Sequence, residues 1–209
     1  MDDLKLANLL CTRLCHDIVG PVGAVNNGLE LLEEMAAGVP ADILEMLRHS
    51  AESTTRRLRF FRAAFGLPTS ATTAETLDGV RDLADGMFGH GRIVLAWPQG
   101  APPGALGRPE HGQLLLVMLW CAAEALPRGG RIDIAFAGGD GGPRITAAGH
   151  PVAFDDAARR MLAGTPADDG LDPRRLAPYL AWRLATAAGR RLVLDESIAD
   201  RAVLAAEPG

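Results

Sequence analysis

The sequence lacks the features that mark several large classes of protein. Its 209 residues include only three cysteines, an odd number without framework spacing, so we expect reduced thiols and no disulfide scaffold. It has no apolar run of the ~18 residues that span a bilayer, so we expect no membrane partner. The net charge of -5 argues against nucleic acid as a partner, because proteins that bind phosphates are normally basic. The first segment, MDDLKLANLL, is acidic where a signal peptide is basic, and we expect a cytoplasmic location.

A metal site is not favoured either. Cys11, Cys15 and His16 lie close together in the sequence, but a tight zinc site needs a fourth ligand, usually from a second pair of Cys or His. The nearest other histidine, His49, is isolated. We therefore expect no metal, and we expect the two thiols to be small buried groups in a helix.

Two helical segments open the chain. In the first, apolar residues recur every three or four positions within a stripe that is roughly 100° wide at about 100° per residue. In the second, steps of four and three alternate, as in the heptad seam of a helical bundle. The two sets are Leu10, Leu14, Ile18, Pro21, Val25, Leu29 and Leu32, and then Leu47, Ala51, Thr54, Leu58, Phe61 and Phe65. Gly38 and Pro40 separate the segments, so we predict an antiparallel helical hairpin.

A lone hairpin leaves its seam without a partner. Two hairpins from two copies of the chain would close a four-helix bundle, so we predict a homodimer through this region. The alternative is that the remainder of the chain covers the seam within one copy.

A polar linker, Gly66–Thr76, separates the hairpin from a second part of the chain. We assign residues 1–67 to the hairpin domain and residues 72–209 to the second domain. Helices are predicted near 74–88, 110–126, 155–162 and 173–188, and strands near 92–97, 131–137, 143–149, 191–197 and 202–207. A loop rich in glycine and proline spans 99–109. A sheet covered by helices on one side forms an α/β sandwich, so the whole chain is predicted to be of the α+β class.

The most unusual segment of the first helix is LCHDIVGPVGAVNNGLELLEE, residues 14–34. Pro21 lies inside it, at a cost of roughly 3 kcal/mol, and leaves the carbonyl group of Asp17 without its helical donor. His16 lies about 200° from Leu14, so we expect a solvated imidazole that is substantially neutral and can act as a nucleophile. An adjacent carboxylate can orient such a ring. An exposed His beside an Asp is nevertheless common, and composition and spacing alone leave both interpretations open.

Arginines on the second helix carry a weaker signal. Arg48, Arg56, Arg59 and Arg62 share an arc of about 120°, which could meet an acidic partner or a phosphoryl group. The alternative is a solvated face on which Glu45 and Glu52 pair with the arginines.

The segment RLCHDIVGPVGAVNNGLELLEE, residues 13–34, resembles the H-box of two-component histidine kinases, in which a proline follows five positions after the histidine. It is most similar to the ChpT-type histidine phosphotransferases, with their pattern LCHDL…P.GA..NGLELL. The resemblance implies a dimeric four-helix bundle and a second domain like a degenerate GHKL (Bergerat) kinase ATPase domain. It implies that His16 is the phosphoacceptor and that Asp17 orients or deprotonates its imidazole. The phosphoryl group would come from a receiver-domain aspartate and pass to another receiver.

The resemblance extends to a nucleotide site whose motifs are lost. QLLLVMLWCAAEAL, residues 113–126, aligns with the kinase N-box, but Val117 and Cys121 replace the asparagines, and Mg²⁺ prefers oxygen ligands. In residues 145–151, which align with the DxGxG box, Ala147 replaces the Asp that reads adenine and Pro151 replaces the last Gly. The lid, residues 164–180, retains only Gly164 and Gly170. We therefore expect no ATP and no bound cofactor, with Mg²⁺ supplied by the receiver.

The resemblance also suggests partners. These are response-regulator receiver domains and the receiver domain of a hybrid histidine kinase, docked around His16. The residues predicted to contact them are Arg13, Ile18, Val19, Asn26, Arg56 and Arg59. Gly20 stands where related phosphatase-competent kinases carry a Thr or Asn that positions water, so transfer should outrun hydrolysis. The alternatives are a dimeric adaptor or antikinase that docks receivers without accepting phosphate, and a working histidine kinase.

Overall fold

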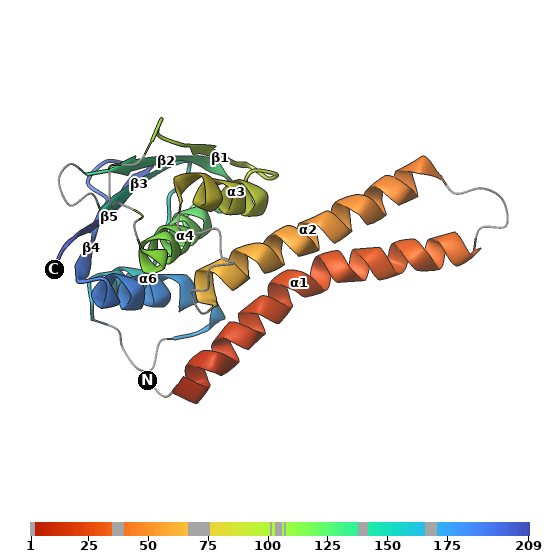
Figure 1. Cartoon of the computed structure of the whole chain (residues 1–209), viewed down its shortest axis with the longest axis horizontal. Coiled ribbons are helices and arrows are strands. Elements are labelled where there is room, and N and C mark those ends of the chain that lie inside the picture. The colour runs from red at the N-terminus through yellow and green to blue at the C-terminus, as the bar shows by residue number, and fades with distance from the viewer. Residues whose placement is uncertain are drawn as a thin grey trace.

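A long helical hairpin projects from a domain that contains a β-sheet and several helices (Figure 1). This computed structural model describes residues 3–34, 40–66, 76–100, 102, 106, 108–137, 142–165 and 171–209. The predicted α+β class is confirmed. The centre of the predicted linker, most of the loop at 101–107, and Gly38 and Gly170 lie outside the described residues, so the predicted domain boundary stays a prediction.

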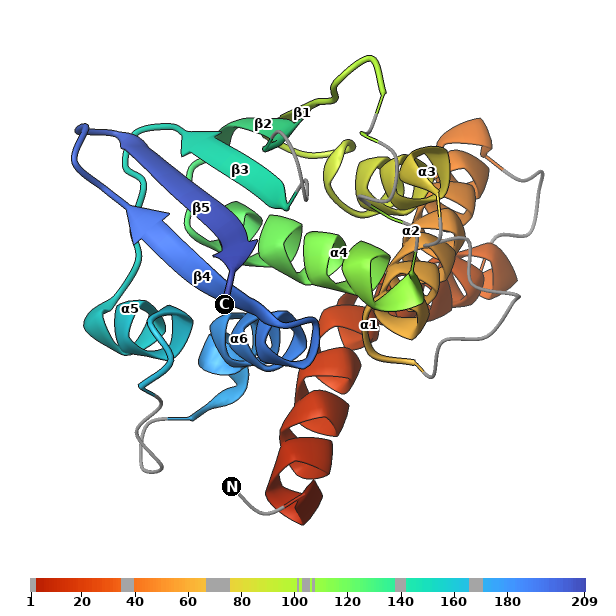
Figure 2. The same cartoon turned by 60° about the vertical axis from the view of Figure 1, so that its left-hand side comes forward.

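The hairpin consists of α1 (Asp3–Glu34) and α2 (Ala41–Phe65), which lie side by side (Figures 1 and 2). Helix α1 continues through Pro21, as the apolar stripe predicted. The helices approach closely at Gly28, which is buried against Met46 and Leu47 of α2. Since α1 and α2 run antiparallel, a contact between residues 28 and 47 places His16 at the level of the C-terminal end of α2.

The C-terminal domain is built on a five-stranded sheet in the order β1-β2-β3-β5-β4. The strands are β1 (Ile93–Ala96), β2 (Gly130–Phe136), β3 (Pro143–Ala148), β4 (Arg190–Asp195) and β5 (Arg201–Pro208). Only β1 and β2 pair in parallel, and the other neighbours are antiparallel. All five lie within two residues of their predicted positions.

Helices cover one face of this sheet (Figure 2). They are α3 (Leu77–Phe88), α4 (Pro109–Glu124), α5 (Asp156–Leu162), the 3-10 helix η2 (Pro173–Arg175) and α6 (Leu176–Ala187). The central helix, α4, is buried continuously from Leu114 to Ala122. Such a helix is apolar all round because other elements pack on every side of it.

Aromatic contacts join the hairpin to the domain. Trp120 of α4 packs against Phe61 and Phe65 of α2, with ring centroids 5.8 Å and 5.4 Å apart. The C-terminal end of the predicted seam is therefore covered within one chain, as the alternative to the dimer required. Leu58, one turn before Phe61, and Leu44, near the hairpin tip, remain exposed on α2.

Two further predictions concern the thiols near His16 and a membrane span. Cys11 and Cys15 are exposed, so the prediction of buried thiols is wrong for this pair, because both lie outside the stripe that faces α2. None of the helices in the described segments combines the length and the hydrophobicity that a bilayer span requires.

The close approach at Gly28 predicts opposite effects for two glycine substitutions in α1. A Cβ at Gly28 would lie 2.7 Å from Leu47 Cδ2, whereas a Cβ at Gly23 would have no atom within 4 Å. Gly23→Ala should raise the free energy of unfolding by up to about 1 kcal/mol through helix propensity. Gly28→Ala should lower it, because overpacking costs about 1–3 kcal/mol. Urea unfolding at one protein concentration tests this, and equal stabilisation by both would contradict the packing.

Candidate functional site

His16 and Asp17 lie on α1, about one turn before Pro21. The His16 side chain is 81% exposed, as the helical periodicity predicted, but the Asp17 side chain is only 8% exposed. Asp17 Oδ1 lies 2.9 Å from His16 Nδ1. In the neutral ring that donates this hydrogen bond to the carboxylate, Nδ1 carries the proton and Nε2 keeps its lone pair. The geometry therefore presents an oriented nucleophile to solvent.

Arg13 holds Asp17 from the other side. Its Nε donates a hydrogen bond to Asp17 Oδ2 at 2.9 Å, while its terminal nitrogen forms an ion pair with Glu124 Oε1 at 2.6 Å. The guanidinium also lies over the ring of Trp120, 4.9 Å from the centroid, and donates to the carbonyl oxygen of Pro173 at 3.3 Å. Helices α4 and η2 thus hold the Arg13 side chain in place, and Arg13 in turn holds Asp17.

The pKa values of Glu124 and Arg13 are both shifted in this network. Desolvation raises the pKa of Glu124 to about 7, although the neighbouring Arg13 opposes the shift. Desolvation acts to lower the pKa of Arg13, but Glu124 and Asp17 outweigh it, so the net shift is upward. Arg13 therefore stays charged, while Glu124 can gain or lose its proton near neutral pH.

The positions predicted to have lost nucleotide contacts lie in or beside α4. Val117 is buried in the core, and Cys121 borders a hollow of about 170 Å³ near Glu124 and Arg175. Burial raises the pKa of the Cys121 thiol well above its ordinary value, so the sulfur is held as a neutral thiol. Ala147 is buried on β3. Within the described segments, no cluster of three or more His, Cys, Asp or Glu could hold a metal ion.

The structure separates the residues predicted to contact a partner. Val19 and Asn26 are exposed on α1 and Ile18 is half-buried. Arg59 is exposed on α2. Arg56 instead packs along Gly86 of α3.

Two of the predicted arginines already have partners within the chain. The guanidinium of Arg13 is engaged by Asp17 and Glu124. Arg48 pairs with Glu45 and Glu52, each at 2.6 Å, as the interpretation of a solvated face required. Glu124 was not predicted, because it is far from Arg13 in the sequence and follows an apolar run. The one available signal was the four-residue spacing of Arg13 and Asp17, which predicts a pair on one helix face.

Comparisons with known proteins identify relatives of this chain. Residues 77–199 match the family model of the histidine phosphotransferase C-terminal domain. The protein phosphotransferase ChpT of Brucella abortus is 34% identical over 199 residues, which are 94% of this chain and 93% of that protein. The solved structure of a bacterial phosphotransferase is 30% identical, with a TM-score of 0.78 over 99% of this chain and 98% of the other. Both relatives align with the hairpin as well as with the C-terminal domain.

The raised pKa of Glu124 predicts a pH-dependent stability. Between pH 4.5 and about pH 7, Glu124 of the folded protein retains a proton that the unfolded chain has released. This proton contributes fully to stability below pH 4.5, and the contribution is lost as the pH rises through 7. From about pH 5 to about pH 8, the wild type should lose on the order of 1–3 kcal/mol relative to Glu124→Gln. Urea unfolding of both proteins at both pH values measures the difference. The same pH dependence in both proteins would contradict the assignment.

Proposed function

The chain belongs to the histidine phosphotransferase family, and from that premise we propose that His16 carries a phosphoryl group between two receiver domains. The protein is a phosphotransferase, and the observation that supports the proposal is the exposed imidazole of His16, oriented by a buried carboxylate. The donor would be the aspartyl phosphate of a first receiver, such as that of a hybrid histidine kinase. The acceptor would be the aspartate of a response regulator. Such a relay would operate in the cytoplasm.

The transfer step follows from the tautomer. The lone pair on His16 Nε2 attacks phosphorus, and the bond between phosphorus and the receiver's carboxylate oxygen breaks, so that the aspartate leaves as a carboxylate. The imidazole ring becomes positively charged, and Asp17 stabilises that charge through the proton on Nδ1. The second receiver reverses this step by attacking the phosphohistidine. The receivers would bring Mg²⁺, which neutralises phosphoryl oxygens.

Arg13 and Glu124 act as positioning residues in this proposal. Arg13 occupies Asp17 Oδ2, which leaves Oδ1 for the histidine. Glu124 and Trp120 hold the guanidinium in place. Arg13 therefore supports the site from within the chain, and we propose that receivers dock on the exposed residues Val19, Asn26 and Arg59, with Ile18 at the edge of this surface. Gly20 has no side chain to aim a water molecule, so the phosphohistidine is passed on faster than it is hydrolysed.

We propose further that the C-terminal domain does not use ATP. The hollow beside α4 has a volume of about 170 Å³, which is below the usual range for small-molecule sites. Its wall carries the neutral thiol of Cys121, a poor ligand for Mg²⁺. The domain instead supplies Glu124, which supports Arg13.

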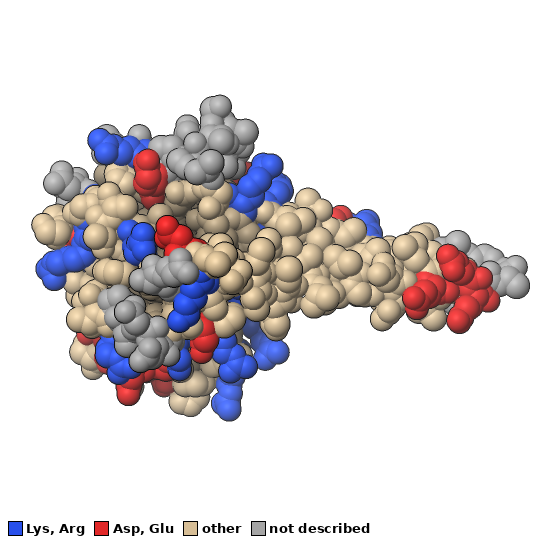
Figure 3. All heavy atoms as spheres, turned by 90° about the horizontal axis from the view of Figure 1, so that it is seen from below, with Lys and Arg blue, Asp and Glu red and all other residues tan. Residues whose placement is uncertain are grey.

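We also propose that two hairpins form a four-helix bundle. Exposed apolar residues seven positions apart, Val22 and Leu29, form a stripe on α1, and Leu44 and Leu58 lie on a second stripe on α2. On the face seen in Figure 3, the hairpin carries few charged side chains between its base and its acidic tip. Apolar stripes on both helices fit pairing with a second copy of the same chain.

The relay is tested by labelling the purified protein with a phosphorylated receiver domain. We expect acid-labile phosphate on the wild type and none on His16→Ala. His150→Ala is a matched control, because His150 is also exposed, at 82%, and lies 2.8 Å from Asp200. Labelling of His16→Ala, or loss of labelling in His150→Ala alone, would refute the assignment of the phosphoacceptor.

The bundle is tested by the combined substitutions Val22→Glu and Leu58→Glu, which place four charges in the proposed interface of a dimer. We expect sedimentation at the mass of a monomer, whereas the wild type sediments as a dimer. Val94→Glu introduces the same charge at an exposed apolar residue of β1 and should leave the dimer intact. A monomeric wild type would rule out the bundle.

A further inference from the structure

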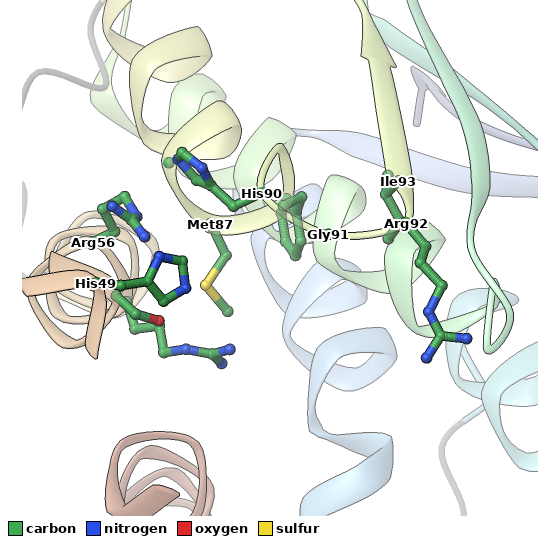
Figure 4. Close-up of a pocket in the computed structure, with 11 residues that line it drawn as sticks. His49, Arg56, Met87, His90, Gly91, Arg92 and Ile93 are labelled. Atoms are coloured by element: carbon green, nitrogen blue, oxygen red, sulfur yellow. The ribbon is translucent and has the colours of Figure 1, made fainter. Parts of the chain in front are cut away.

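A second hollow lies where α2 meets the C-terminal domain, away from His16 and Asp17. Its volume is about 300 Å³, and it opens between α2, the C-terminal end of α3 and the turn that leads into β1 (Figure 4). His49 of α2 and Met87 of α3 lie next to each other in this view, and His90 and Arg92 belong to the turn. The hollow is therefore built jointly by the hairpin and the C-terminal domain.

The lining of this hollow is cationic. Its eleven residues include three arginines and two histidines but no Asp or Glu, in a chain whose net charge is -5. Arg56 has an acidic neighbour, Glu52, at 3.4 Å, but Arg48 holds the same carboxylate at 2.6 Å. Such a concentration of positive charge in a concave site attracts anions.

Two of these arginines, Arg57 and Arg92, have unpaired N–H donors on their side chains within the described part of the chain. In the segments that the structure describes, no hydrogen bond or ion pair engages the side chain of Arg57 or that of Arg92. Arg57 extends from α2 and Arg92 from the turn before β1, so the two come from different elements that line the hollow. Figure 4 shows the exposed side chain of Arg92 directed away from His49 and Met87. A guanidinium group presents paired N–H donors that match the oxygens of a phosphate.

Apolar side chains also line the hollow. Met87 and Phe88 of α3 and Ile93 of β1 are all half-buried and line the same space. Small-molecule sites typically combine such an apolar surface with a few polar groups, and 300 Å³ is at the lower end of their volumes. The ligand that fits is small, and carries both an anionic group and a compact organic part.

We propose that this hollow binds a small organic phosphate. Its phosphoryl oxygens accept hydrogen bonds from Arg57 and from Arg92, whose exposed side chain turns toward α2 when the phosphate binds, and its organic part packs on Met87 and Phe88. The site stays open in the proposed bundle, since His49 and Ser53 lie nine residues from Leu58 and Leu44 and so about 180° away around α2. A bound phosphate joins α2 to the turn before β1, and therefore fixes the hairpin against the C-terminal domain at a place other than the Trp120 contact.

The test uses the full chain and phenyl phosphate as the probe, with the amide signals of Gly86 and Gly91 followed by NMR. We expect saturable shifts of these amides and tighter binding of phenyl phosphate than of inorganic phosphate or phenol. The combined substitutions Arg57→Gln and Arg92→Gln should weaken binding roughly tenfold or more, because two charged hydrogen bonds are lost. Arg62→Gln with Arg128→Gln removes the same charge from exposed positions outside the hollow and should change binding less than about twofold.

Several outcomes would overturn the proposal. One is a linear shift without saturation, spread over arginines throughout the chain, which would indicate nonspecific attraction. Another is equal weakening by the two pairs of substitutions. A third is a shift of these amides on addition of an acidic receiver domain but not of phenyl phosphate, which would make the hollow part of a protein interface. Amide signals remote from the hollow show in each case whether the variant is folded.

Discussion

The candidate site depends on one half-buried cation, the guanidinium of Arg13. It hydrogen-bonds Asp17, pairs with Glu124 and lies over the ring of Trp120, so it joins the hairpin to α4. Removing either carboxylate partner would leave a partly buried charge without compensation, which is costly in a protein interior. Asp17 owes its low exposure and its orientation to this arrangement. The arrangement of His16 and Asp17 is therefore a property of both parts of the chain and not of α1 alone.

A comparison of two His-Asp pairs shows why sequence spacing alone could not identify the site. His16 and His150 are equally exposed, and each lies within 2.9 Å of a carboxylate. The carboxylates differ, because Asp17 is 8% exposed and Asp200 is 50% exposed. A solvated Asp is free to leave its histidine, whereas a buried Asp with a second partner holds one tautomer of the ring. That difference in exposure depends on tertiary contacts, which helical periodicity does not report.

Most of the fold could be predicted from local patterns. The heptad spacing of α2 and the alternation of β2 and β3 record which face of each element is buried, and burial is what periodicity reports. The prediction of buried Cys11 and Cys15 failed because it rested on the apolar character of a thiol, whereas each cysteine lies one residue beyond the apolar stripe of α1. Glu124 was missed for a related reason. A carboxylate at the end of an apolar helix looks like a solvated helix end until the fold brings Arg13 to it.

The aromatic contact of Trp120 with Phe61 and Phe65 limits how such proteins can be divided. A hairpin cut from its domain would expose an aromatic surface and lose the carboxylate that steadies Arg13. The smallest part of the protein that can form this site is consequently the hairpin together with α4. If the C-terminal domain does not use ATP, as we propose, it would still be retained in evolution as a scaffold. Recombination that exchanged hairpins between distant relatives would have to exchange α4 with them.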